Sequence, residues 1–236
     1  MGALVLTVFL AAGQPRALGP GLAYRELAGP SFTLAVMEVD PARAGLRVLD
    51  ARRFGRPALT AREFAERSGA VAVVNASFFD DRTTPLGLVV SDREVRNPPR
   101  RSGWGIFFVS GGRARIVGPG GFSVSRSIEQ AVQVGPRLVS GGRVTRLKPQ
   151  SARRSVVGVD RAGHVYLAVT TRGEADASEL AALLARPPAE GGLGLVDALN
   201  LDGGGSTQLH LRAAGFEQDE RGIWPVPIAI GVFPRP

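Results

Sequence analysis

Residues 195–207 read LVDALNLDGGGST, an apolar strand that ends in a polar tip, and this combination occurs twice in the chain. An apolar run of strand length ends at Asp202, and three glycines and two hydroxyl residues follow at once. Successive glycines lose much backbone entropy on folding and supply no packing. The chain therefore either makes a plain turn here or lets another group come close to its backbone. Because the glycines follow a carboxylate, we give the plain turn and the close approach of another group about equal weight.

The order of helix, buried strand and polar tip occurs twice in the sequence. Helices are predicted over residues 59–69 and 176–188, and each precedes an apolar strand. The first strand ends in NASFFD, residues 75–80, and the second ends at Asp202. Ligands often bind beyond the ends of buried strands in sheets that carry helices. We therefore expect the two polar tips to line one cleft.

Short β-like runs, separated by glycines and other turn residues, dominate the rest of the chain. They predict an α+β fold with mixed β-sheets and a few packed helices, in a single domain. The clearest hairpin joins residues 154–160 to 164–171. The expected strands cover residues 31–40, 45–51, 70–79, 85–92, 104–110, 113–118, 131–140, 154–160, 164–171, 195–201, 206–212 and 226–233.

The composition excludes several classes of function. The 236 residues contain no cysteine, which rules out disulfides, zinc–thiolate sites and thiol nucleophiles. A net charge of +8 invites a nucleic-acid-binding interpretation. We disfavour it, because the arginines are scattered and aromatic residues, at 6%, are too few to form stacking platforms.

The N-terminus contains an apolar stretch, ALVLTVFLAAG over residues 3–13, of the length of a signal-peptide core. It is too short to span a bilayer, so no stable membrane insertion is expected. No basic residue precedes it, which leaves a degenerate export signal and a first buried strand as alternatives. We divide the chain into a signal-like or disordered segment, 1–22, and a folded domain, 23–236. Export would place the protein outside the cytoplasm, in a secreted or extracytoplasmic location.

Single residues near the tips are weak signals by themselves. An amide at Asn75 suits hydrogen bonds to sugar hydroxyls, and Phe78 or Phe79 can form an apolar wall. Arg137, and Arg153 or Arg154, lie beside predicted strands and have the forked shape that binds phosphate or carboxylate, although surface arginines are common in this chain. Both histidines lack the spacing of a metal site or a catalytic triad.

Four segments in a fixed order carry a family resemblance. They read NASFFD (75–80), GPRLV (135–139), RSVVG (154–158) and LDGGGS (201–206), and PVPIAIGVF (225–233) closes the chain. In this order the chain resembles the phosphodiester glycosidase family, which includes the uncovering-enzyme domain and bacterial relatives labelled exopolysaccharide-biosynthesis-like. The chain departs from the family pattern at Ala76 and Ser77, where the family has two glycines.

The resemblance implies hydrolysis of a sugar-1-phosphodiester at its C1–O bond, with a cell-envelope or exopolysaccharide-type glycan as partner. A non-catalytic glycan-binding protein on the same scaffold is the alternative. No cofactor is implied, although a divalent cation between Asp202 and Asp80 stays open. The implied catalytic residues are Asp202, as nucleophile or general base, Arg154, as phosphate clamp, Asn75, and Asp80 as a second carboxylate. The implied substrate-binding residues are Gly203, Gly204, Gly205, Ser206, Thr207, Arg137, Ser77 and Phe79.

Overall fold

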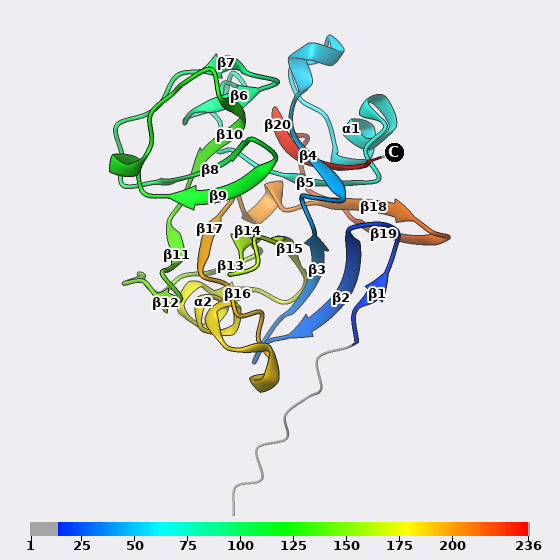
Figure 1. Ribbon diagram of the computed structural model, residues 1–236, viewed down its shortest axis with the longest axis vertical. Coiled ribbons are helices and arrows are strands. Elements are labelled where there is room, and N and C mark those ends of the chain that lie inside the picture. The colour runs from blue at the N-terminus through cyan, green and yellow to red at the C-terminus, as the bar shows by residue number, and fades with distance from the viewer. Residues whose placement is uncertain (1–13, 236) are drawn as a thin grey trace, which may run out of the picture.

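The computed structural model describes residues 14–235, whose strands form three larger sheets and one short pair (Figure 1). The apolar stretch at residues 3–13 lies outside the described residues. Of the segment 1–22, the described part contains strand β1, Arg16–Ala17, and the start of strand β2. No helix in residues 14–235 is long and apolar enough to cross a membrane.

An eight-stranded sheet carries one of the two polar tips. Its strand order is β1-β2-β3-β15-β14-β17-β11-β12. The tip at Asp202 follows β17, which lies between β14 and β11 inside this sheet. Beyond β1, the strands are β2 (Leu22–Ala28), β3 (Thr33–Val39), β15 (Val165–Arg172), β14 (Ser155–Val159), β17 (Asp197–Asn200), β11 (Arg137–Ser140) and β12 (Arg143–Val144).

Two five-stranded sheets complete the architecture, and one of them carries the other tip. The first contains β7 (Glu94–Asn97), β6 (Val89–Ser91), β10 (Ile128–Val134), β8 (Gly105–Ser110) and β9 (Arg113–Val117) in spatial order. The second contains β19 (Phe216–Glu220), β18 (Leu209–Ala213), β5 (Ala72–Asn75), β20 (Ile228–Pro234) and β4 (Ala44–Asp50). A short pair joins β13 (Ser151–Ala152) to β16 (Ala175–Asp176).

The two α-helices form where the sequence predicts, and each is shorter than its predicted range. Helix α1 (Ala61–Ser68) starts with a capping box between Thr60 and Glu63 and stops at Gly69, whose φ is 76°. The N-cap of α2 (Ala177–Ala185) is Asp176, whose carboxylate accepts from two N–H groups of the first turn. Four 3₁₀ turns cover Ala51–Phe54, Pro119–Gly121, Pro188–Glu190 and Gly204–Ser206.

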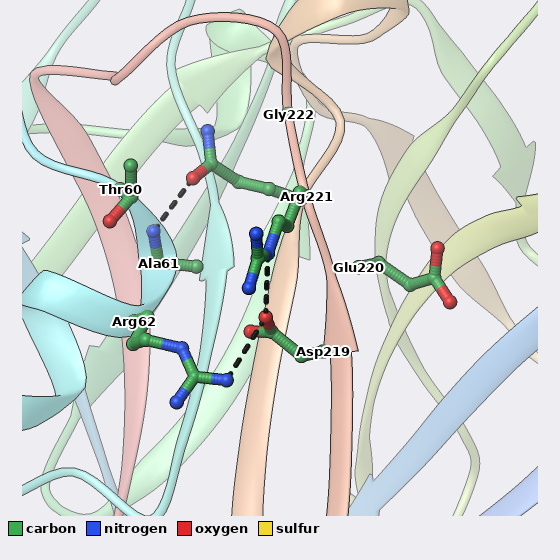
Figure 2. Close-up of a pocket in the computed structure, with 8 residues that line it drawn as sticks. Thr60, Ala61, Arg62, Asp219, Glu220, Arg221 and Gly222 are labelled. Carbon is green, nitrogen blue, oxygen red and sulfur yellow. Dashed lines mark hydrogen bonds and ion pairs between the residues drawn. The ribbon is translucent and has the colours of Figure 1, made fainter.

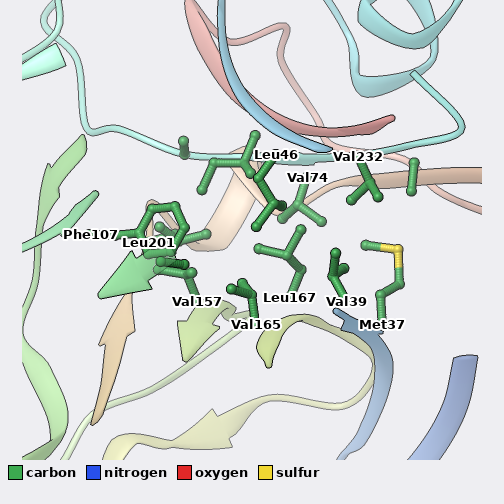
Figure 3. Packing of buried hydrophobic residues seen from close by; sticks show 14 of the residues in the cluster. Met37, Val39, Leu46, Val74, Phe107, Val157, Val165, Leu167, Leu201 and Val232 are labelled. Carbon is green, nitrogen blue, oxygen red and sulfur yellow. The ribbon is translucent and has the colours of Figure 1, made fainter. Parts of the chain in front are cut away.

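The main core fills the space between the three sheets (Figure 3). Leu167 of β15, Val74 of β5 and Phe107 of β8 come from different sheets and pack in this one cluster. The outer face of the eight-stranded sheet packs against α2, and the second five-stranded sheet packs against α1. Strand β14 is buried on both faces, because Val156 packs toward α2 and Val157 toward the main core.

The structure confirms the α+β class and the two predicted helices. The described sheets are antiparallel rather than mixed as predicted, because each pairing between the described strands is antiparallel, including those of β5 and β17. The single strand expected over 131–140 is two strands, β10 and β11, because Pro136 has no N–H to continue the ladder. The Gly135–Pro136 bond is cis.

Candidate functional site

The two polar tips lie side by side, although they come from different sheets. The Asn75 side chain donates from Nδ2 to the carbonyl of Asp202 at 2.7 Å, across 127 positions of sequence. The Asp202 N–H donates in turn to the carbonyl of Ala76 at 2.9 Å. These two bonds join the end of β5 to the end of β17 and confirm that the tips converge.

Asn75 is fully buried and holds three segments together. Its Oδ1 accepts from the hydroxyl of Ser155 at 2.7 Å and from the N–H of Gln208 at 3.1 Å. Both ends of its amide are therefore engaged with the protein itself. This geometry fits a residue that positions Asp202, and a contact between Asn75 and a sugar stays a prediction.

Asp202 carries a carboxyl group with an altered acidity. Partial burial raises its pKa above the ordinary value, and hydrogen bonding from the Ser206 hydroxyl and the Gly203 N–H offsets part of that rise. A carboxylate with a raised pKa is a stronger base than a free one. Asp202 is thus suited to take a proton or to attack an electron-poor carbon.

The three glycines after Asp202 are explained by close contacts within the protein. A Cβ on Gly203 would lie 2.7 Å from the carbonyl oxygen of Arg153, and one on Gly205 would lie 2.6 Å from Nε1 of Trp224. Gly204 has a φ of 58°, in the left-handed region that glycine adopts most easily. At Gly203 and Gly205, the absence of a side chain therefore lets other parts of the protein pack directly against the backbone.

Arg154 is a buried cation beside this loop, with 5% of its surface exposed. Its guanidinium donates from Nε to the carbonyl of Ala175 at 3.2 Å and from Nη1 to Oδ1 of Asn200 at 3.4 Å, and its Nη2 also contacts the carbonyl of Gln150. Within residues 14–235 no carboxylate lies close enough to form an ion pair with it. Burial lowers its pKa, the negative charges of Asp176 and Glu174 offset part of that fall, and the arginine side chain stays protonated.

Two hydroxyl groups next to the tips have no partner in the described part of the chain. They are Oγ of Ser77 and Oγ1 of Thr207, both almost completely buried. Ala76, the other departure from the family pattern, packs into the main core, and its side chain belongs to the apolar cluster there. The additional Cβ of Ala76 therefore fills core space.

The remaining predicted residues lie near the tips without a hydrogen bond or ion pair to Asp202 among the described residues. The carboxylate of Asp80 accepts from two N–H groups of its own turn, at 2.9 and 2.8 Å, and its pKa is lowered, most strongly by the Thr84 N–H. Phe79 packs in the apolar cluster beneath α1. Arg137 lies against Gly105, where an ideal Cβ would be 3.0 Å from its Cγ. Their functional roles stay predictions.

Sequence reasoning assigned no role to three residues that build the site. Asn200 accepts from Arg154, Gln208 accepts and donates at the back of the glycine loop, and Trp224 packs on Gly205. A signal existed for Gln208, because an amide inside an otherwise apolar strand pattern needs a buried partner. Nothing in the local sequence indicates that Trp224 lies beside residue 205.

A cavity of about 240 Å³ lies between the start of α1, at residues 60–62, and residues 219–222 (Figure 2), and Gln208 also lines it. Its polar groups are largely paired with one another. The Gln208 Oε1 accepts from the Ala61 N–H at 2.6 Å, and Asp219 binds both Arg62 and Arg221. Asp202 does not line this cavity, so the cavity and the joined tips are separate features.

We expect Gln208→Leu to destabilise the protein by about 1–3 kcal/mol, because it leaves buried backbone groups without partners. These are the Ala61 N–H and the carbonyls of Ser206 and Trp224. Urea unfolding monitored by circular dichroism measures the free energy. Gln218→Leu, on partly exposed β19, is the matched control and should cost much less. Equal stability of the two variants would contradict the role of Gln208.

In the described residues no group of three or more histidine, aspartate or glutamate side chains is arranged to hold a metal ion. The carboxylate of Asp80 already accepts hydrogen bonds from two N–H groups of its own turn. The cation between Asp202 and Asp80 therefore gains no support from the described geometry, and its absence stays a prediction.

Residues 68–233 match the family model described as phosphodiester glycosidase. None of the curated proteins gives a significant match. Among solved structures, the catalytic domain of zebrafish N-acetylglucosamine-1-phosphodiester alpha-N-acetylglucosaminidase, auto-inhibited by its pro-peptide, superposes with a TM-score of 0.70 at 16% identity. The match covers 95% of this chain and 87% of the zebrafish one.

Two other solved structures share the fold. A hypothetical protein from Synechocystis has a TM-score of 0.66 at 19% identity, covering 91% of this chain. The chain spans only 62% of the length of that relative. A Burkholderia pseudomallei protein described as exported has a TM-score of 0.54 at 14% identity, covering 90% of this chain and 74% of the other. At these identities the structures establish the fold alone.

Proposed function

The chain belongs to the phosphodiester glycosidase family, an enzyme family that acts on sugar phosphodiesters, and on that premise we propose that it hydrolyses a sugar-1-phosphodiester. In the proposed reaction, the oxygen of water adds to C1 of the sugar. The bonding pair of the C1–O bond leaves with the phosphate, and the water gives up one proton, which passes to the solvent or to the departing phosphate. The products are a free sugar and a phosphomonoester.

The observation that carries the proposal is the set of groups around the joined tips. The carboxyl group of Asp202, with its raised pKa, lies in the same loop as the Gly204 backbone, which hydrogen-bonds to the residue before Arg154. Arg154 supplies a buried positive charge that no described carboxylate neutralises by an ion pair. A carboxylate and an unpaired cation match the two charges of the reaction, the electron-poor C1 and the departing phosphate.

The chemistry of the leaving group explains why one carboxylate suffices. A phosphomonoester has its second ionisation near a pKa of about 6, so it leaves without full protonation. An ordinary glycosidase expels a sugar alkoxide and needs a second carboxylic acid to protonate it. We assign Asp202 to the attack at C1, as nucleophile or general base, and Arg154 to the phosphate.

The substrate class is a further part of the proposal. We propose a glycan of the cell envelope or an exopolysaccharide that carries sugar-1-phosphodiester links, and an extracytoplasmic site of action. The likeness in fold to the Burkholderia protein whose description calls it exported and the apolar stretch at residues 3–13 support that location.

Turnover of UDP-N-acetylglucosamine, UDP-glucose and UDP-galactose in water enriched in ¹⁸O tests the reaction. We expect release of the free sugar with the label in the sugar, because the C1–O bond breaks. Label in the phosphate would indicate P–O cleavage and contradict the proposal. Tight binding of these compounds without turnover would favour the non-catalytic glycan-binding alternative.

A further inference from the structure

The segment 221–225 crosses the glycine loop and is fixed there at three points. The Ile223 N–H donates to the carbonyl of Gly205 at 2.7 Å. Nε2 of Gln208 donates to the carbonyl of Trp224 at 3.1 Å, and Nη1 of Arg153 donates to the carbonyl of Arg221 at 3.3 Å. The backbone that carries Trp224 is thus tied directly to the loop that carries Asp202.

The indole ring of Trp224 packs directly on Gly205. A Cβ at Gly205 would lie within 2.6–2.7 Å of three indole atoms, so any side chain there would displace the ring. Yet 54% of the surface of Trp224 is exposed. The other tryptophan, Trp104, is by contrast packed on Phe78 with ring centroids 4.9 Å apart. Tryptophan is enriched at interfaces, where one side of the ring is packed and the other meets polar groups.

The two ends of the glycine loop have different neighbours, the backbone of the segment that carries the buried Arg154 at one end and an indole ring at the other. Gly203 contacts the backbone of Arg153 and Arg154, while Gly205 contacts Trp224. We expect a phosphate group to lie beside Arg154, because the face of an indole ring has no hydrogen-bond donor or positive charge to stabilise an anion. The C–H face of a sugar ring suits the negative face of an aromatic system.

We propose that Trp224 is a specificity-determining residue whose exposed indole face stacks on the pyranose ring of the substrate. The inference rests on the proposed function, because it places the sugar of that reaction at the Gly205 side of the loop and the phosphate at the Arg154 side. The aromatic ring then orients C1 toward Asp202. It selects for a sugar with an unobstructed C–H face.

Kinetics of Trp224→Ala, Trp224→Phe and Ile223→Ala test the proposal. We expect Trp224→Ala to lower kcat/KM for UDP-N-acetylglucosamine by about tenfold or more, while Trp224→Phe retains most of it. Ile223→Ala is the matched control, because Ile223 is the adjacent residue and is 70% exposed. It should remain near wild type. A kcat/KM for Trp224→Ala within about twofold of wild type would overturn the inference.

Binding measured without turnover separates this inference from the reaction. In an Asp202→Asn background, calorimetry should show that Trp224→Ala weakens binding of N-acetylglucosamine and of UDP-N-acetylglucosamine but leaves inorganic phosphate unaffected. Should the wild type bind these sugars in a Trp224-dependent way without hydrolysing them, the proposed reaction fails and the stacking surface stands. Equal loss of phosphate and sugar affinity, or no sugar binding at all, would overturn the stacking surface.

Discussion

Asp202→Asn should lower turnover of a sugar-1-phosphodiester by at least about 10³-fold, because an amide neither attacks C1 nor accepts a proton from water. The substitution keeps the size of the side chain and the backbone bonds of residue 202 to Asn75 and Ala76. Single-turnover product release, followed by chromatography, gives the rate. Retained turnover would remove Asp202 from the mechanism.

The same variant should be as stable as the wild type at neutral pH or slightly more stable. Burial raises the pKa of Asp202 in the folded state above its value in the unfolded chain. Such a group favours folding most below the unfolded pKa, and that contribution is lost as the pH rises through the folded pKa. At pH 7 the charged carboxylate therefore opposes folding slightly, whereas a neutral amide does not. A loss of many degrees in Tm would mean that Asp202 has a structural role.

The fold was predictable where local patterns decide it. The capping box at Thr60 and the stop at Gly69 define α1, and the polar turn between β14 and β15 defines their hairpin. Strand β2 escaped prediction because Arg25 and Glu26 interrupt its apolar pattern. The edge strand β19, FEQDE, also escaped prediction, because its residues are mostly polar. Among the described strands it pairs with only one neighbour, β18, so it can form without an apolar pattern.

The site was predictable in part, because two unusual tips stood out and proved to be hydrogen-bonded to each other. For the glycines, the sequence left a plain turn and a close approach as alternatives, and it did not show which groups approach. Gly203 and Gly205 are required by Arg153 and Trp224, and contacts between distant segments leave no mark in local sequence. The partners of Asn75 were also not predictable from the local sequence. Its amide oxygen accepts hydrogen bonds from Ser155 and Gln208, which are distant along the chain.

Arg154→Lys should lower kcat/KM by about 10²-fold and weaken competitive inhibition by inorganic phosphate, because a lysine keeps the charge but loses the planar fork. The wild-type guanidinium has five N–H donors, and the described residues use three of its nitrogens through one bond each. Donors therefore remain for an anion. A buried cation without an ion pair is costly to the fold, and a bound phosphate would offset that cost.

Arg154→Ala removes the charge as well and should lower kcat/KM further, to about 10³-fold below wild type. It also leaves the carbonyls of Ala175 and Gln150 without this donor, so some loss of stability is expected. Phosphate inhibition distinguishes the two effects, because a purely structural residue would lower Tm without changing the inhibition constant of the folded fraction. Arg146→Ala removes the same charge from an exposed loop and serves as the control for net charge. If folded Arg154→Lys binds phosphate and turns over substrate as the wild type does, Arg154 is no clamp, and the positive charge at the leaving group must come from another residue.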